Sequence, residues 1–124
     1  MIFSEGNKHK PAIKFDKNTG VLSITGSSFP ENAIVVYDPV IKWIEKFNFN
    51  EVETFTVKIS LEYYNTATSK KLFEIIKNLN QTYQNGKKIE IIWEYLGDDE
   101  DMFESGRYYS ELVEIPFRFI EIQD

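Results

Sequence analysis

The chain has 124 residues, the usual length of one domain, and its 42% of hydrophobic and 15% of aromatic residues argue against intrinsic disorder. It contains no cysteine, which excludes disulfides and thiolate metal sites. Its net charge of -6 disfavours binding to nucleic acid, because such binders concentrate Lys and Arg on one face.

The first ten residues are polar, and we expect residues 1–10 to be a flexible amino-terminal segment of a single domain that spans residues 1–124. His9, the only histidine, lies in this segment, which disfavours a histidine-based catalytic triad. Residues 12–15 and 21–25 then predict two strands. The turn-forming residues 16–20 join them, so a hairpin opens the fold.

A first helix is expected after a turn at residues 29–32. Asp38 predicts an N-cap and Pro39 the first helical position, where proline is tolerated. The residues that follow form one apolar stripe at helical spacing, namely Val40, Trp43, Ile44 and Phe47.

Residues 55–63 alternate strictly between apolar and polar side chains, which predicts a strand with one buried face. The apolar members are Phe55, Val57, Ile59, Leu61 and Tyr63. A strand covered on both faces would instead read as a continuous apolar run. The pattern therefore predicts an α/β fold with helices on one side of the sheet and water on the other.

A second helix follows directly, with Leu72, Ile76 and Leu79 at helical spacing, and Asn85-Gly86 is a typical helix stop. The strand that begins after Lys87 alternates in the same one-sided way, and we expect it to lie parallel to the strand at residues 55–63 through a right-handed crossover. The acidic residues 98–101 predict the start of a third helix over residues 102–112. Residues 116–121 predict a final strand.

The segment of residues 65–71 carries three hydroxyl groups, on Thr66, Thr68 and Ser69, at the expected start of the second helix. Backbone N–H groups in a first helical turn have no helical partner, so a phosphate on Thr66 would meet the positive end of the helix dipole and the nearby Lys70 or Lys71. Simple N-capping by Thr66 or Asn65 is an alternative and is compatible with phosphorylation.

The acidic residues 98–104 allow a different hypothesis, a small metal-dependent hydrolase or transferase. Their spacing lacks the oxygen pattern and turn glycine of an EF-hand, so a solvated, helix-capping or partner-facing cluster is favoured. A constitutive scaffold module is a third hypothesis. We expect no cofactor and no metal. No apolar run approaches the length of a membrane span and no signal sequence is evident, so the expected compartment is the cytoplasm and no membrane partner is expected.

The chain resembles the SiaC family of bacterial regulatory phosphoproteins over about residues 11 to 117. Five segments carry the resemblance, namely residues 28–32, 37–44, 64–66, 93–95 and 99–102. Each segment is weak alone, but together they are specific. The resemblance implies a fold similar to the STAS domain, with helices packed mainly on one face of a mixed sheet.

The resemblance also implies a non-enzymatic partner switch in cyclic-di-GMP and biofilm signalling. A kinase would phosphorylate Thr66, with Thr68 as a secondary candidate, and a PP2C-type phosphatase would reverse the modification. The unmodified form would bind and activate a diguanylate cyclase or another output protein. The residues expected to contact partners are Asn65, Thr66, Ala67, Thr68, Ser69, Lys70 and Lys71.

Overall fold

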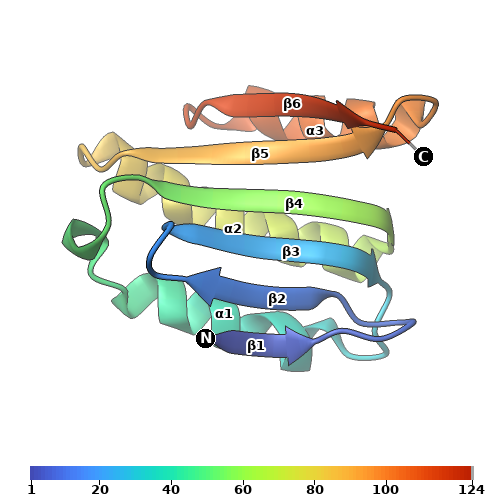
Figure 1. The fold of residues 1–124 in the computed structure, drawn as a ribbon, viewed down its shortest axis with the longest axis horizontal. Helices are drawn as coiled ribbons and strands as arrows, with labels where there is room; N and C mark the ends of the chain where they lie inside the picture. Colours follow the sequence, from blue (N-terminus) through green and yellow to red (C-terminus); the bar gives the residue numbers. More distant parts are fainter. Residues whose placement is uncertain (124) are drawn as a thin grey trace.

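The computed structural model describes residues 1–123 as one six-stranded sheet with three helices (Figure 1). In chain order the elements are β1 (Ile2–Glu5), β2 (Ala12–Asp16), β3 (Val21–Ser28), α1 (Ala33–Lys46), the short 3-10 helix η1 (Phe49–Glu51), β4 (Phe55–Tyr64), α2 (Thr66–Gln84), β5 (Ile89–Leu96), α3 (Glu100–Leu112) and β6 (Phe117–Ile122). The predicted mixed α/β fold is therefore confirmed.

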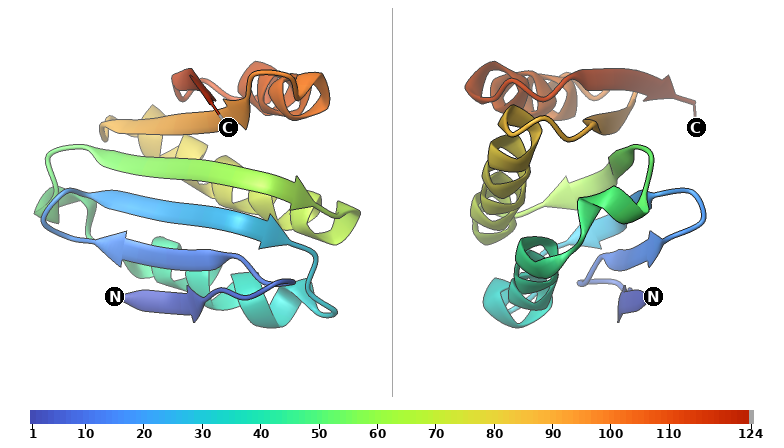
Figure 2. Two further views of the ribbon diagram at one scale, coloured as in Figure 1. Left: turned by 45° about the vertical axis from the view of Figure 1, so that its right-hand side comes forward. Right: turned by 90° about the vertical axis from the view of Figure 1, so that its left-hand side faces the viewer.

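The strands lie in the sheet in the same order as in the chain. β1, β2 and β3 are antiparallel neighbours, whereas β3, β4, β5 and β6 are parallel. Each parallel connection passes through one helix and steps in the same direction, and such crossovers are right-handed. All three helices consequently cover one face of the sheet (Figure 2), and each begins at the edge where the parallel strands end, here called the carboxyl edge (Figure 1).

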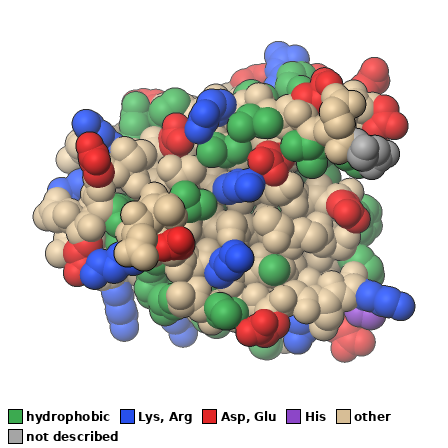
Figure 3. Space-filling view, in the orientation of Figure 1, with side chains coloured by type: hydrophobic (Ala, Val, Ile, Leu, Met, Phe, Trp, Pro, Cys, Tyr) green, Lys and Arg blue, Asp and Glu red, His purple; other side chains and the backbone are tan. Residues whose placement is uncertain are grey.

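The core lies between the sheet and this helical layer. The apolar side predicted for β4 is buried up to Leu61, together with Phe55, Val57 and Ile59, but Thr56, expected on the solvent side, is buried as well. The helices contribute the other side of the core, including Val36, Tyr37, Val40 and Ile44 from α1, Leu72, Ile75, Ile76 and Leu79 from α2, and Met102 and Tyr109 from α3. No helix of residues 1–123 covers the opposite face of the sheet, and that face shows charged side chains among apolar ones (Figure 3).

The predicted start of the first helix, at Pro39, is wrong by six residues. α1 begins at Ala33, and the side chain of Asn32 caps it by accepting a hydrogen bond from the Ile34 backbone N–H at 3.1 Å. Pro39 lies inside the helix, where it removes one backbone hydrogen bond. Both Pro39 and Val35, whose carbonyl loses that donor, are exposed, so the missing bond falls on the solvent side of α1.

β4 contains a bulge that the regular alternation does not predict. Gly26 pairs with Leu61 and Ser27 pairs with Tyr63, so Glu62 is an extra residue in β4. One extra residue moves the following side chains to the other face. Tyr63, predicted to be buried, is therefore 55% exposed, and Tyr64 turns inward towards Trp93 with the ring centroids 6.4 Å apart.

The amino-terminal residues also differ from expectation, because the sequence predicts no strand before Ala12. Ile2–Glu5 forms β1, which is paired with β2 at one edge of the sheet. Phe3 anchors this strand, since its ring lies against Trp43 with centroids 5.3 Å apart. The predictions for the later elements are confirmed: Gly86 follows α2 at a φ of 102°, β5 is parallel to β4, and Asp99 caps α3.

Candidate functional site

The amino end of α2 lies at the carboxyl edge, directly after β4. Asn65 is its N-cap, because its Oδ1 accepts the backbone N–H of Thr68 at 2.9 Å. The Asn65 backbone N–H donates to the carbonyl of Ser28 at 3.0 Å, which ties the end of β4 to the end of β3. Of the two capping residues considered from the sequence, Asn65 takes the role, and Thr66 is the first residue of the helix.

The three hydroxyl groups of this segment have different surroundings. The side chain of Thr66 is exposed. Thr68 is fully buried, and its hydroxyl lies 2.8 Å from Ser28 Oγ and donates to the Ser28 carbonyl at 3.0 Å. Ser69 is half-buried, and its Oγ lies 2.8 Å from the hydroxyl of Tyr109 on α3. Of these three residues, only Thr66 is exposed.

A buried hydroxyl cluster, formed by Ser28, Tyr37 and Thr68, lies beneath the amino end of α2. The Tyr37 hydroxyl is 2.7 Å from Ser28 Oγ, so the cluster joins β3, α1 and α2. Burial raises the pKa of Tyr37 to about 12, although the hydrogen bonds with Ser28 and Thr68 act in the opposite direction. Tyr37 therefore stays protonated and the cluster stays neutral at physiological pH.

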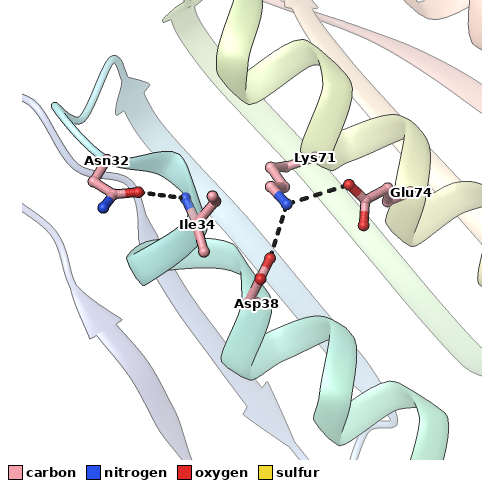
Figure 4. A network of polar contacts seen from close by, with 5 residues as sticks. All are labelled: Asn32, Ile34, Asp38, Lys71 and Glu74. Carbon is pink, nitrogen blue, oxygen red and sulfur yellow. Dashed lines mark hydrogen bonds and ion pairs between the residues drawn. The ribbon is translucent and has the colours of Figure 1, made fainter.

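Lys71 links α2 to α1 a little further along the helix. Its Nζ lies 2.9 Å from Asp38 Oδ1 and 3.2 Å from Glu74 Oε1 (Figure 4). The hydrogen bond to Asp38 is the main reason why the pKa of Lys71 is raised. The two lysines proposed as phosphate partners thus differ, because Lys71 is held between two carboxylates whereas Lys70 is exposed.

The predicted partner-binding segment is therefore only partly at the surface. Thr66, Ala67 and Lys70 are exposed, Asn65, Ser69 and Lys71 are half-buried, and Thr68 is buried. The sequence analysis did not identify Ser28, Tyr37 or Tyr109 as neighbours of this segment. Ser28 could have been recognised from the sequence. It lies an even number of residues after Leu22 and Ile24 in β3 and therefore on the same buried face, where a polar side chain is unusual.

The acidic run after β5 has a structural role in the fold. Asp99 Oδ1 accepts the Met102 backbone N–H at 3.0 Å, and Glu100 and Asp101 lie in the first turn of α3, where the helix dipole favours negative charge. Within residues 1–123, no three His, Asp or Glu side chains come together in a way that could hold a metal ion. None of the helices in this part of the chain combines the length and apolar composition that crossing a membrane requires.

This chain is similar to known proteins of Pseudomonas aeruginosa. Over 112 residues it is 30% identical to the uncharacterized protein PA14_02130 of Pseudomonas aeruginosa strain UCBPP-PA14, which covers 90% of this chain and 89% of that protein. A crystal structure of the diguanylate cyclase SiaD in complex with its activator SiaC, also from Pseudomonas aeruginosa, contains a chain that superposes with a TM-score of 0.90 at 28% identity, covering 98% of this chain and 99% of that one.

The crystal structure of apo-SiaC from the same organism superposes with a TM-score of 0.83 at 29% identity, covering 94% of this chain and 95% of that chain. The model of the SiaC family of regulatory phosphoproteins matches residues 4–122, which is nearly the whole sequence. The resemblance seen in the sequence is confirmed, and the chain belongs to the SiaC family of regulatory phosphoproteins.

Proposed function

We propose that this protein is a non-enzymatic switch whose Thr66 is reversibly phosphorylated, and whose unphosphorylated form binds and activates an output protein such as a diguanylate cyclase. A partner kinase adds the phosphate and a PP2C-type phosphatase removes it. The observation that carries the proposal is that Thr66 is exposed, whereas the hydroxyls of Thr68 and Ser69 make hydrogen bonds within the fold.

The fold can accept a phosphate on Thr66 without rearrangement. Thr66 is the first helical residue, where backbone N–H groups lack helical partners and the dipole favours an anion. The first turn of α2 contains no acidic residue that would repel the phosphate. Lys70 lies one helical turn away and is exposed, so its ammonium group can approach the phosphate.

The same phosphate acts strongly on a partner that covers Thr66. It adds roughly 1.5 to 2 negative charges at neutral pH, and burying a charge without a partner costs several kcal/mol. Since about 1.4 kcal/mol changes a dissociation constant tenfold, one phosphate suffices to release a bound protein. The cyclase as output partner is supported by the SiaD–SiaC complex of the structural relative, and the kinase and phosphatase by the family's description as regulatory phosphoproteins.

Mass spectrometry of the chain purified from its native host tests the modification. We expect one phosphate on Thr66, no phosphate on the Thr66→Ala variant, and an unchanged phosphate on a Ser69→Ala variant. Phosphate found only on other residues would contradict the proposal.

A cyclase assay tests the output. The host's diguanylate cyclase is purified separately and its formation of cyclic-di-GMP from GTP is measured with each form of the chain. The unphosphorylated protein and Thr66→Ala should raise the rate, whereas Thr66→Glu should not. Equal activation by Thr66→Ala and Thr66→Glu would show that charge at this position does not control the output.

A further inference from the structure

Four exposed apolar side chains gather at the carboxyl edge. They form what we call the apolar rim, which consists of Phe29, Ile34, Val35 and Tyr63, with exposed fractions of 37%, 56%, 64% and 55%. Single exposed apolar residues are ordinary, but a contiguous group marks a contact surface. The rings of Phe29 and Tyr63 are in edge contact, with centroids 5.7 Å apart, so these two members are continuous.

The apolar rim lies beside Thr66. The Asn65 backbone N–H donates to the Ser28 carbonyl. Since Asn65 precedes Thr66 and Ser28 precedes Phe29, this bond holds Thr66 close to Phe29. On the other side, α1 and α2 both begin at the carboxyl edge, and the Asp38–Lys71 ion pair sets their register (Figure 4). Ile34 lies one turn before Asp38, and Ala67 lies one turn before Lys71. The same register therefore places Ile34 beside Ala67, the residue after Thr66.

An open groove of about 350 Å³ continues the apolar rim between α1 and the loop that joins β1 to β2. Phe29, Pro30 and Val35 line one side of it, and His9 and Lys10 line the other. The Phe29 backbone N–H donates to the His9 carbonyl at 2.8 Å, and the Asn7 side chain accepts the backbone N–H groups of both His9 and Lys10 at 2.8 Å. The groove therefore exists before any partner binds.

The surroundings of this surface are less negative than the chain as a whole, whose net charge is -6. Lys8, Lys10 and Lys70 stand around it, against Glu31 and Glu62. The amino ends of α1 and α2 add two positive dipole ends, and neither first turn contains an acidic residue. The complementary partner is an apolar segment flanked by carboxylates.

We infer that the apolar rim and its groove are the surface by which the output protein holds this chain, and that the bound segment is apolar with acidic residues at its border. This inference rests on the proposed function. A phosphate on Thr66 then weakens binding in two ways, because it adds charge to a surface that binding dehydrates and it cancels the positive potential that attracts the acidic border.

Val35→Glu tests the apolar contact with little risk to the fold. Val35 is the third residue of α1 and is exposed, and a glutamate there interacts favourably with the helix dipole. Calorimetric titration with the host's purified diguanylate cyclase should show a dissociation constant at least roughly 30-fold weaker than that of the unphosphorylated wild type, since a buried unpaired charge costs several kcal/mol.

Two further variants complete the design. Lys10→Glu should weaken binding several-fold, and this effect should shrink as salt is added, because it acts through exposed charges. Leu112→Glu is the matched control. Leu112 is 47% exposed but is the last residue of α3, which ends on the side of the sheet where the parallel strands begin, far from the carboxyl edge. The Leu112→Glu variant should bind as the wild type does.

The outcomes separate the two proposals. If Thr66→Glu loses the cyclase while Val35→Glu and Lys10→Glu bind as the wild type does, the surface assigned here is wrong and the Thr66 switch stands. If Leu112→Glu weakens binding as strongly as Val35→Glu, the assigned surface is again wrong. If the unphosphorylated wild type does not bind the cyclase at all, both proposals fail.

Discussion

Thr66 and Thr68 are two residues apart, and helix geometry alone gives them opposite environments. Successive residues turn by about 100° around a helix, so two residues separate these side chains by roughly 200°. Thr68 shares the face of Leu72, one turn later, which is fully buried, whereas Thr66 shares the face of Lys70, which is exposed. The apolar stripe of α2 could therefore have ranked Thr66 above Thr68 from the sequence, although it gives no sign of the partners that Thr68 meets.

Replacing each threonine by valine removes the hydroxyl and keeps the shape of the side chain. The change in the free energy of unfolding then measures the difference between the two environments. Thr68→Val removes a hydroxyl that bonds to Ser28 in the buried cluster, so we expect the free energy of unfolding to fall by about 1 to 2 kcal/mol. Thr66→Val changes an exposed side chain and should alter it by less than about 0.5 kcal/mol. Urea denaturation of both variants provides the comparison, and equal losses would contradict the assigned burial.

The buried tyrosines predict a loss of stability in alkali. The pKa of Tyr37 is about 12 in the folded protein, against about 10 when unfolded, so above pH 10 the unfolded chain binds fewer protons and stability falls as pH rises. The decline should approach about 1.4 kcal/mol per pH unit between about pH 10 and pH 12 for this tyrosine. Burial also raises the pKa of Tyr109, which adds a loss of the same sign.

Urea denaturation across this pH range, with the Tyr37→Phe/Tyr109→Phe double variant for comparison, checks the effect. The two proteins share all their other ionisable groups, so only the two tyrosines distinguish their pH dependence. The double variant should therefore show the flatter dependence. Parallel curves would mean that the two hydroxyls titrate alike in the folded and unfolded states.

At the scale of the elements, periodicity predicted the strands and helices well wherever one local pattern decides them. β4, α2 and β5 follow from alternation, an apolar stripe and the Asn85-Gly86 stop. The prediction failed at α1, because Asp38-Pro39 is a typical helix start but the better cap, Asn32, and exposed flanking residues allow Pro39 inside the helix. It also failed at Tyr63, because a bulge depends on pairing with β3, which no single-strand pattern records.

The contact between α3 and β5 depends on a glycine that no local pattern explains. Gly106 is buried in the middle of α3, and a Cβ there would lie 2.6 Å from two atoms of the Trp93 indole ring. The ring cannot easily move away, since its Nε1 donates to the Met102 carbonyl at 2.9 Å and the Tyr109 ring packs beside it.

Gly106→Ala should consequently destabilise the protein. Alanine favours a helix by about 1 kcal/mol over glycine, but forcing a methyl group into a filled contact costs more, so we expect a net loss of about 1 to 3 kcal/mol. The neighbouring Ser105→Ala, on the same helix, should be neutral or slightly stabilising. Thermal denaturation and near-ultraviolet circular dichroism check both variants, and a more stable Gly106→Ala would refute the tight packing.

At the scale of the whole molecule, strand order decides where the site lies. The one-sided alternation of β4 predicted a single helical layer, but the order of the strands is a long-range property that the sequence pattern does not contain. Because β3, β4 and β5 are parallel and each is followed by one of the α-helices, the starts of α1, α2 and α3 line up along one edge (Figure 1). Thr66, the apolar rim and the hydroxyl cluster thereby share one end of a rigid sheet.

This arrangement predicts that the proposed switch at Thr66 works by changing a surface and leaves the fold intact. The cap by Asn65, the buried hydroxyl of Thr68 and the ion pair of Lys71 hold the first turns of α2 independently of Thr66. In amide NMR spectra of Thr66→Glu, we expect shift changes only at the starts of α1 and α2 and in residues 28–32. The slowly exchanging amides of β3, β4 and β5 should remain protected, because sheet cores open only with global unfolding. Widespread shift changes reaching β6, or lost protection in the central strands, would instead mean that charge at Thr66 acts by loosening the sheet.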